Sequence, residues 1–145
     1  MAMLSLGLPW RQASPEQRTR FVAEFRTMLV RTYTSTILEY AEAEIEYLPA
    51  RTGTRTRDGY RKVYTKVVPG QGQPPVEVIY SLREKDGQWL TYDVSIDGVS
   101  LIKNYRTNFS REVRDAGLAS LIERLAERNR QMKVERVGLP AEQDN

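Results

Sequence analysis

The spacing of hydrophobic and polar positions changes twice along the chain. From Pro15 to about Ala43 the apolar residues recur every three or four positions, which predicts a long amphipathic helix. Between Glu44 and Ile96 they alternate with polar residues, which predicts strands. Helical spacing returns after Ser100. The pattern predicts an α+β fold with a long N-terminal helix, an antiparallel sheet of about four strands and two C-terminal helices.

The long helix has a clear start and an aromatic face. Ser14 is a good N-cap, Pro15 suits the first helical position and Gln17 completes a capping box. The apolar stripe that follows consists of Phe21, Phe25, Met28, Leu29, Thr32, Tyr33, Thr36, Ile37 and Tyr40.

Four alternating segments predict the sheet. They are Glu44–Leu48, Tyr60–Val68, Val76–Arg83 and Trp89–Ile96. Polar or Gly- and Pro-rich segments at 51–59 and 69–75 separate them, and Lys85-Asp86-Gly87 predicts a hairpin turn. We expect the stripe of the long helix to face Val78, Tyr80, Leu82, Tyr92 and Val94 of this sheet.

The C-terminal part predicts two helices. Leu101, Ile102, Tyr105 and Phe109 form the stripe of the first, and Gly117 is its expected end. A short helix follows, with Leu118, Leu121, Ile122 and Leu125 on one face. From Asn129 the chain is charged and aperiodic, so residues 130–145 are expected to form a flexible tail. Residues 1–145 are thus expected to form a single domain.

Composition narrows the chemistry. The 145 residues include no His and no Cys, which removes the usual general base, thiolates and Ser-His nucleophiles. Without paired carboxylates on one face, an α+β enzyme is the least favoured class. No apolar run approaches the roughly 18 residues of a membrane span. The first residues lack the basic segment of a signal peptide, and the sequence does not reveal the compartment.

Charged side chains offer few candidates. Asp93 lies in the middle of a strand, where a carboxylate is a general base less often than it faces solvent or pairs with an arginine such as Arg106. A basic cluster in and beside the 51–59 loop consists of Arg51, Arg55, Arg57, Arg61 and Lys62. It is either a solvated loop or a site for the phosphates of nucleic acid or lipid. The arginines of the last helices alternate with acids and indicate a solvent face, with Arg111, Arg114, Arg124, Arg128 and Arg130 as members.

Two long blocks carry a family resemblance. The first is Trp10 to Tyr33, WRQASPEQRTRFVAEFRTMLVRTY, and the second is Trp89 to Phe109, WLTYDVSIDGVSLIKNYRTNF, followed by GLASLIERLAERN. In order and spacing they resemble the MlaC or toluene-tolerance family of periplasmic phospholipid-binding proteins. The resemblance covers about residues 6–129. Members usually carry a signal peptide and an N-terminal helical segment ahead of the first block, and neither is expected here.

The resemblance implies a non-enzymatic carrier that moves phospholipid between the outer and inner membranes and so maintains outer-membrane lipid asymmetry. Its implied partners are an inner-membrane ABC transporter with an MCE-type protein and an outer-membrane lipoprotein–porin complex. It implies a bound phospholipid, with no cofactor, metal or nucleic acid. The second interpretation, a basic module that binds nucleic acid or another anionic polymer, leaves both blocks unexplained.

An apolar cavity between sheet and helices is implied by the same resemblance. Periodicity alone does not separate such a cavity from a filled core. Val99, where the sheet passes into the helix, is the first candidate to line it, and Gly98 beside it is expected to need a positive φ. The other candidates are inward positions on facing elements: Leu29, Tyr33, Val78, Tyr80, Tyr92, Val94, Ile102 and Tyr105.

Overall fold

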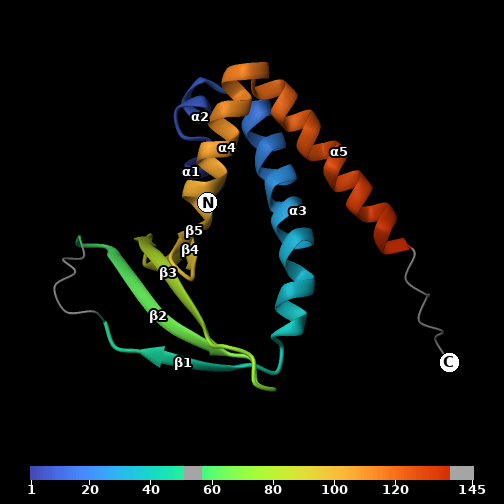
Figure 1. Cartoon of the computed structure of the whole chain (residues 1–145). Helices are drawn as coiled ribbons and strands as arrows, with labels where there is room; N and C mark the ends of the chain where they lie inside the picture. Colours follow the sequence, from blue (N-terminus) through green and yellow to red (C-terminus); the bar gives the residue numbers. More distant parts are fainter. Residues whose placement is uncertain (51–56, 138–145) are drawn as a thin grey trace.

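The computed structural model describes residues 1–50 and 57–137, with the side chains of 133–137 left out. Its helices are α1 (Ala2–Leu6), α2 (Leu8–Gln12), α3 (Pro15–Glu39), α4 (Leu101–Ala116) and α5 (Leu118–Val137). Its strands are β1 (Glu44–Leu48), β2 (Tyr60–Val68), β3 (Val76–Lys85), β4 (Gln88–Ile96) and β5 (Val99–Ser100). The predicted α+β order is confirmed, and Figure 1 shows the sheet on one side of α3 and the helix α5 on the other.

The sheet is an antiparallel meander in the order β1-β2-β3-β4-β5. The predicted hairpin turn is present, with Asp86 and Gly87 at φ values of 51° and 76°. Directly paired residues lie on the same face of a sheet. Tyr80 pairs with both Val63 and Val94, and Val78 pairs with both Thr65 and Ile96. One face of the sheet is therefore apolar across three strands.

The buried core lies among the helices and not against the sheet. It contains Leu6 of α1, Phe21, Phe25 and Met28 of α3, Phe109 of α4, and Leu121, Ile122 and Leu125 of α5. The phenylalanine rings form a compact group, with centroids of Phe21 and Phe25 5.7 Å apart and of Phe25 and Phe109 6.0 Å apart. We call these eight residues the helical core.

The helix α3 begins as predicted and ends earlier. The Ser14 hydroxyl accepts a hydrogen bond from the Gln17 amide at 3.2 Å, and the Ser14 amide donates to the Gln17 side chain at 3.1 Å. The helix ends at Glu39, where a turn leads into β1, and not at Ala43. Glu42 and Ala43 continue the helical composition, but β1 needs its first residue, Glu44, extended beside Val68.

The helix α5 corrects the prediction of a short final helix. It continues through Asn129 to Val137, so residues 130–137 are helical and do not form the predicted flexible tail. The rest of that predicted tail, 138–145, lies outside the described residues. Asn129 is only 4% exposed, and its amide donates to the Glu24 carbonyl at 2.9 Å and to the Glu24 carboxylate at 2.7 Å. Asn129 follows Ile122 and Leu125 at helical spacing, so it extends the buried stripe of α5 with a polar residue. The hydrophobic pattern therefore ends before Asn129, although α5 stays packed against α3 at this residue.

Two short N-terminal helices, α1 and α2, were not predicted. Gly7 separates them with a φ of 66°, and Pro9 lies in the first turn of α2. Each helix has five residues, too few to produce a helical period. Leu6 is nevertheless fully buried in the helical core, and the Arg106 side chain donates to the Leu4 carbonyl at 2.8 Å. These contacts hold α1 against α4.

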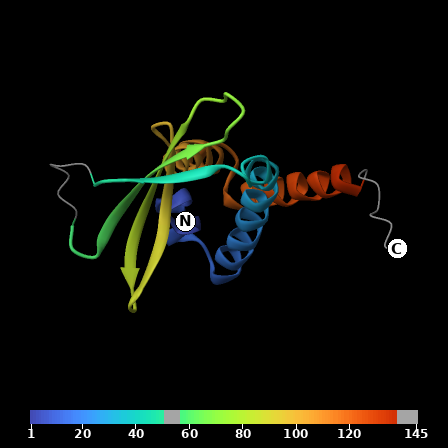
Figure 2. The same ribbon diagram turned by 90° about the horizontal axis from the view of Figure 1, so that it is seen from below.

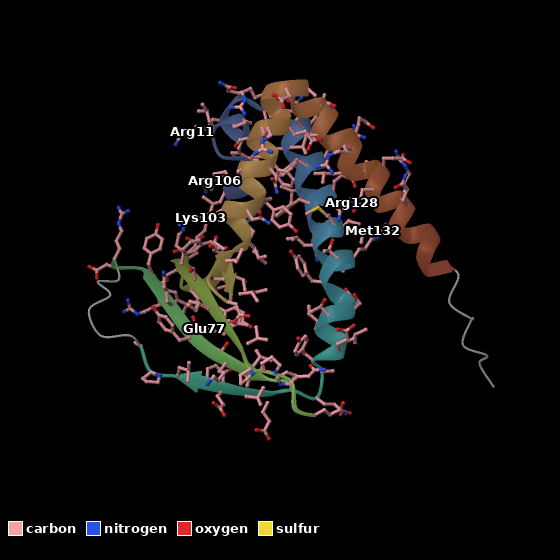
Figure 3. The ribbon with its side chains drawn as sticks, viewed as in Figure 1. Arg11, Glu77, Lys103, Arg106, Arg128 and Met132 are labelled. Atoms are coloured by element: carbon pink, nitrogen blue, oxygen red, sulfur yellow. The ribbon has the colours of Figure 1, made fainter. Side chains whose placement is uncertain are left out.

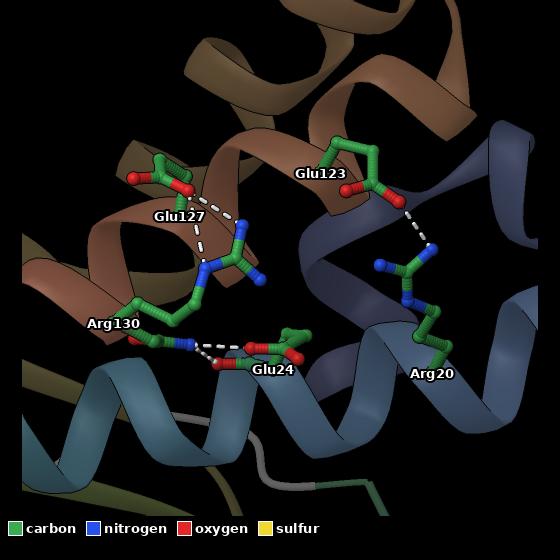
Figure 4. Close-up of polar contacts among 6 residues, drawn as sticks. Arg20, Glu24, Glu123, Glu127 and Arg130 are labelled. Carbon is green, nitrogen blue, oxygen red and sulfur yellow. Dashed lines mark hydrogen bonds and ion pairs between the residues drawn. The ribbon is translucent and has the colours of Figure 1, made fainter.

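Ion pairs lie on the solvent face of the helices, as the alternating charges predicted. Arg130 bonds Glu127 at 2.5 Å, Arg114 lies 3.9 Å from Asp115, and Arg124 bonds Glu112. Arg20 of α3 bonds Glu123 of α5 at 2.5 Å, and this hydrogen bond lowers the pKa of the Glu123 carboxyl (Figure 4). Both partners are about half exposed, so the pair contributes little to stability.

Candidate apolar binding site

Within the described residues, the main contacts of α3 are with other helices and not with the sheet. That helix packs against α5 and α1, whereas α4 is the helix that packs on β4. Phe21, Phe25 and Met28 accordingly point into the helical core, and the expectation that they face the sheet was wrong. The period of a helix tells which residues share a face, but it does not tell which element that face meets.

The sheet therefore keeps an apolar face that is only partly buried. Val63, Val78, Tyr80, Val94 and Ile96 are all half-buried. Toward the edge strand the exposure grows, because Ile45 and Tyr47 of β1, which pair with Val67 and Thr65, are 54% and 76% exposed. Val63, Val67, Val78, Tyr80, Val94 and Ile96 together with Ile45 and Tyr47 are named the apolar sheet face.

The last turn of α3 also exposes two apolar side chains. Ile37 and Leu38 are 67% and 66% exposed, although Ile37 belongs to the predicted stripe. In both views α3 lies between the sheet and α5, and its last turn leads directly into β1 (Figures 1 and 2). Two apolar surfaces that are only partly buried thus belong to consecutive elements of the chain. Such an arrangement is suited to an apolar ligand.

A tyrosine pair marks the border between the helical core and this open region. The hydroxyl groups of Tyr33 and Tyr105 lie 3.0 Å apart, joining α3 to α4. The Tyr105 ring packs edge-on against Phe25 at 5.6 Å and lies 5.5 Å from Phe109. Burial, and next the hydrogen bond from Tyr33, raise the pKa of the Tyr105 hydroxyl well above its usual value. The Tyr105 hydroxyl therefore stays neutral at physiological pH.

The corner between sheet and helix is built on Asp93. Its carboxylate accepts a hydrogen bond from the Ser100 hydroxyl at 2.5 Å and another from the Ile102 amide at 3.1 Å. Asp93 thus serves the N-terminus of α4, where a negative charge is favourable. The two expectations that it faces solvent or pairs with Arg106 were wrong. Gly98 turns this corner with a φ of 84°, as predicted.

The predicted lining residues are distributed over this region. Tyr33, Tyr105 and Leu29 meet at the end of the helical core, and Val78, Tyr80 and Val94 share the apolar sheet face. Ile102 is buried at 4% exposure, and Tyr92 packs edge-on against Tyr60 at 5.9 Å. Val99 is 57% exposed at the corner. Contact of these nine residues with a lipid stays a prediction.

Sequence reasoning left out the residues nearest the edge of the sheet. Ile45 and Tyr47 extend the apolar sheet face to β1, yet they were treated only as a strand signal. Their alternation with Glu44, Glu46 and Leu48 was visible in the sequence. The missing information was the register that places Ile45 beside Val67, because register depends on the loop between the strands.

The basic cluster gives no concentrated anion site among the described residues. Arg51 and Arg55 lie outside them. Arg57 lies over the Tyr60 ring and Arg61 over the Trp89 ring, each at 5.8 Å, so two of the described cations rest on aromatic faces. Lys62 is exposed.

The described part of the chain shows neither a metal site nor a membrane-spanning helix. No group of three or more Asp and Glu side chains there is arranged to hold a metal ion. None of the helices described has the length and apolar character needed to cross a membrane.

The fold and the uncovered apolar sheet define the class, a small α+β protein suited to an apolar ligand. The chain belongs to the MlaC family, whose family model matches residues 1–127. It is 31% identical over 100 residues to the toluene tolerance protein ttg2D of Pseudomonas putida, covering 69% of this chain and 45% of the relative. It is 21% identical over 122 residues to the intermembrane phospholipid transport system binding protein MlaC of Haemophilus influenzae, covering 83% and 56%.

A solved structure has the same fold. It is a phospholipid-binding protein from Ralstonia solanacearum in complex with a phospholipid, with a TM-score of 0.80 and 28% identity. The match covers 91% of this chain and 72% of that one. By contrast, the chain spans about half the length of the curated relatives it matches.

Proposed function

We propose that this protein is a phospholipid-binding carrier, and that the acyl chains of the bound phospholipid occupy the apolar sheet face beside α3. The single observation that carries the proposal is that α3 leaves this face only partly buried. Its likeness to a protein solved with a phospholipid supports the identity of the ligand. Val99, Leu29, Tyr33, Val78, Tyr80, Tyr92, Val94, Ile102 and Tyr105 are the residues proposed to line the site.

The magnitude of acyl-chain burial favours a carrier over a freely exchanging binder. Each buried CH₂ group is worth about 0.8 kcal/mol, so an acyl chain of about 15 such groups gains on the order of 12 kcal/mol before costs. A ligand held that strongly leaves slowly into water. Release at a useful rate therefore needs a partner that accepts the lipid directly.

Family membership supports the wider role. The carrier is proposed to work in the periplasm between the outer and inner membranes and to maintain outer-membrane lipid asymmetry. Its proposed partners are an inner-membrane ABC transporter of the MCE type and an outer-membrane lipoprotein–porin complex. We propose no catalysis and no cofactor, since the phospholipid is cargo.

Native mass spectrometry of the purified chain, with lipid extraction from the same sample, tests the proposal. A phospholipid mass that persists through gel filtration is the expected result. Val78→Glu places a carboxylate on the apolar sheet face and is expected to lose lipid. The matched control, Lys85→Glu, places a carboxylate at the distal hairpin and is expected to keep it. Equal lipid content in the two variants contradicts the proposed site, and lipid-free wild-type protein contradicts the function.

A further inference from the structure

A second apolar surface lies where α1 and α2 meet α4. A groove of about 420 Å³ lies here, lined by Met3, Leu4, Gly7, Leu8, Trp10 and Arg11 of the N-terminal segment and by Arg106 of α4. We call it the α1–α2 groove. None of the residues that line the groove belongs to the apolar sheet face, and Figure 1 shows α1 and α2 beside α4 and above the sheet. Nothing in the proposed lipid site uses these residues.

Large apolar side chains stand exposed around the groove. Leu8 is 66% exposed and Met3 is 46% exposed. Trp10 is half-buried beneath the Arg18 guanidinium, which lies 5.3 Å from its ring centre and donates to the Trp10 carbonyl at 3.0 Å. The groove therefore combines protruding aliphatic groups with a fixed indole, the composition of a segment that lies at a membrane surface.

The charge around the groove has one sign. Its lining comes from residues 3–11 and from Arg106, and the two segments that contain these residues, 1–15 and 98–111, have no Asp or Glu. Within the same two segments lie Arg11, Lys103 and Arg106, and Figure 3 places all three on the flank of α4 that faces away from α3. The net charge of the whole chain is only +3, so this flank is more basic than the average surface. Its complement is an anionic surface.

The position of Arg106 is fixed by the fold. Its Nε donates to the Leu4 carbonyl, and its aliphatic part lies 3.7 Å from the position that a Cβ on Gly7 would occupy. The guanidinium is thus held where the chain bends between α1 and α2. A bound guanidinium loses little further side-chain entropy when it meets a phosphate.

We infer that the α1–α2 groove docks the protein on a bilayer surface that contains anionic phospholipid. Exposed Leu8 and Met3 enter the interface, and Arg11, Lys103 and Arg106 meet the head groups. The size of the groove favours a bilayer over a protein partner. A protein interface of standard size buries about 800 Å² on each side, whereas this surface consists of two five-residue helices with a basic rim. The inference rests on the proposed function, because a lipid carrier has a reason to approach a bilayer.

Co-sedimentation with vesicles tests the docking. The probes are vesicles of phosphatidylcholine alone and vesicles in which part of the lipid is phosphatidylglycerol. The intact chain is expected to sediment only with the anionic vesicles and to lose binding as salt is added. Arg11→Gln is expected to weaken partitioning about fivefold, the effect of one cation near a charged surface. Lys85→Gln removes the same charge at the distal hairpin and is expected to bind as wild type.

A second pair of variants tests the apolar contribution. Leu8→Ser and Val30→Ser remove exposed side chains, 66% and 56% exposed, from the groove and from α3. Only Leu8→Ser is expected to weaken sedimentation. Equal effects within either pair overturn the inference, as does a wild-type chain that ignores anionic vesicles or captures an acidic protein instead. Lipid content of each sample, measured by native mass spectrometry, separates failed docking from failure of the carrier function.

Discussion

Tyr105 illustrates how one hydroxyl depends on its burial and on a single partner. Its ring is held by Phe25 and Phe109, and its hydroxyl is bonded to Tyr33 of α3. A tyrosine whose pKa is raised in the folded state stabilises that state fully below the unfolded pKa, near 10. This contribution decreases as the pH rises from there toward the folded value.

Tyr33→Phe tests this coupling. Loss of the hydrogen bond, the second cause of the shift, is expected to move Tyr105 ionisation to lower pH, while burial keeps it above the usual value. The measurement is an alkaline titration of tyrosinate absorbance, with Tyr105→Phe used to assign the step among the eight tyrosines. An unchanged Tyr105 step in Tyr33→Phe means that burial alone sets the pKa.

Val99 tests the predicted corner of the lipid site. Because Val99 is 57% exposed, Val99→Glu is expected to leave the fold intact, yet it places a carboxylate where acyl chains are proposed to pass. Bound phospholipid, quantified after extraction, is expected to be lost. Val30→Glu on α3, at a position 56% exposed, is the matched control and is expected to keep its lipid. A folded Val99→Glu protein with normal lipid content removes Val99 from the site.

Asp93 holds the start of α4 by two hydrogen bonds, which the sequence did not predict. Asp93→Ala is expected to lower the free energy of unfolding by about 2 kcal/mol, because Ser100 and the Ile102 amide lose a charged acceptor. Urea denaturation measures the change. The exposed Asp58→Ala serves as the control. Asp86 is less suited to this purpose because its φ is positive. Equal losses at Asp58 and Asp93 argue against a special role for Asp93.

At the scale of elements, the capping box gives α3 its first residue. Ser14→Ala removes the acceptor of the Gln17 amide and is expected to lower the free energy of unfolding by about 1 kcal/mol. Ser35→Ala, at an exposed position inside the same helix, is expected to be neutral or slightly stabilising because alanine is the better helix former. Thermal or urea unfolding compares the two variants. A neutral Ser14→Ala means that tertiary packing alone fixes the start of the helix.

The elements were predicted more completely than the way they pack. The periods of the sequence placed α3, α4 and four strands, because spacing of apolar residues follows directly from helix and strand geometry. The helices α1 and α2 are too short to show a period, and Asn129 hides the continuation of α5 because its buried amide is polar. The candidate site was predicted residue by residue, but the sheet was expected to lie against the aromatic half of α3. Periodicity carries no information about that choice.

At the scale of the whole molecule, the helices bury their apolar faces against one another, and the apolar sheet face stays only partly buried. Leu6, the α3 aromatics and the α5 leucines close the helical core without any strand residue. The apolar sheet face and the exposed Ile37 and Leu38 are what remains. A protein with this division keeps its fold independent of its ligand, because the core does not need the lipid to form.

Lipid removal tests this division. Ligand that binds only the folded state raises the free energy of unfolding, so delipidated protein is expected to stay folded but to melt at a lower temperature. It is also expected to bind more of a dye that reports exposed apolar surface, and re-addition of phospholipid reverses both changes. Val78→Glu, which alters the apolar sheet face, is expected to melt at the same temperature before and after extraction. Unfolding of the delipidated wild type would mean that the helical core depends on the lipid, and an unchanged melting temperature would place the lipid elsewhere.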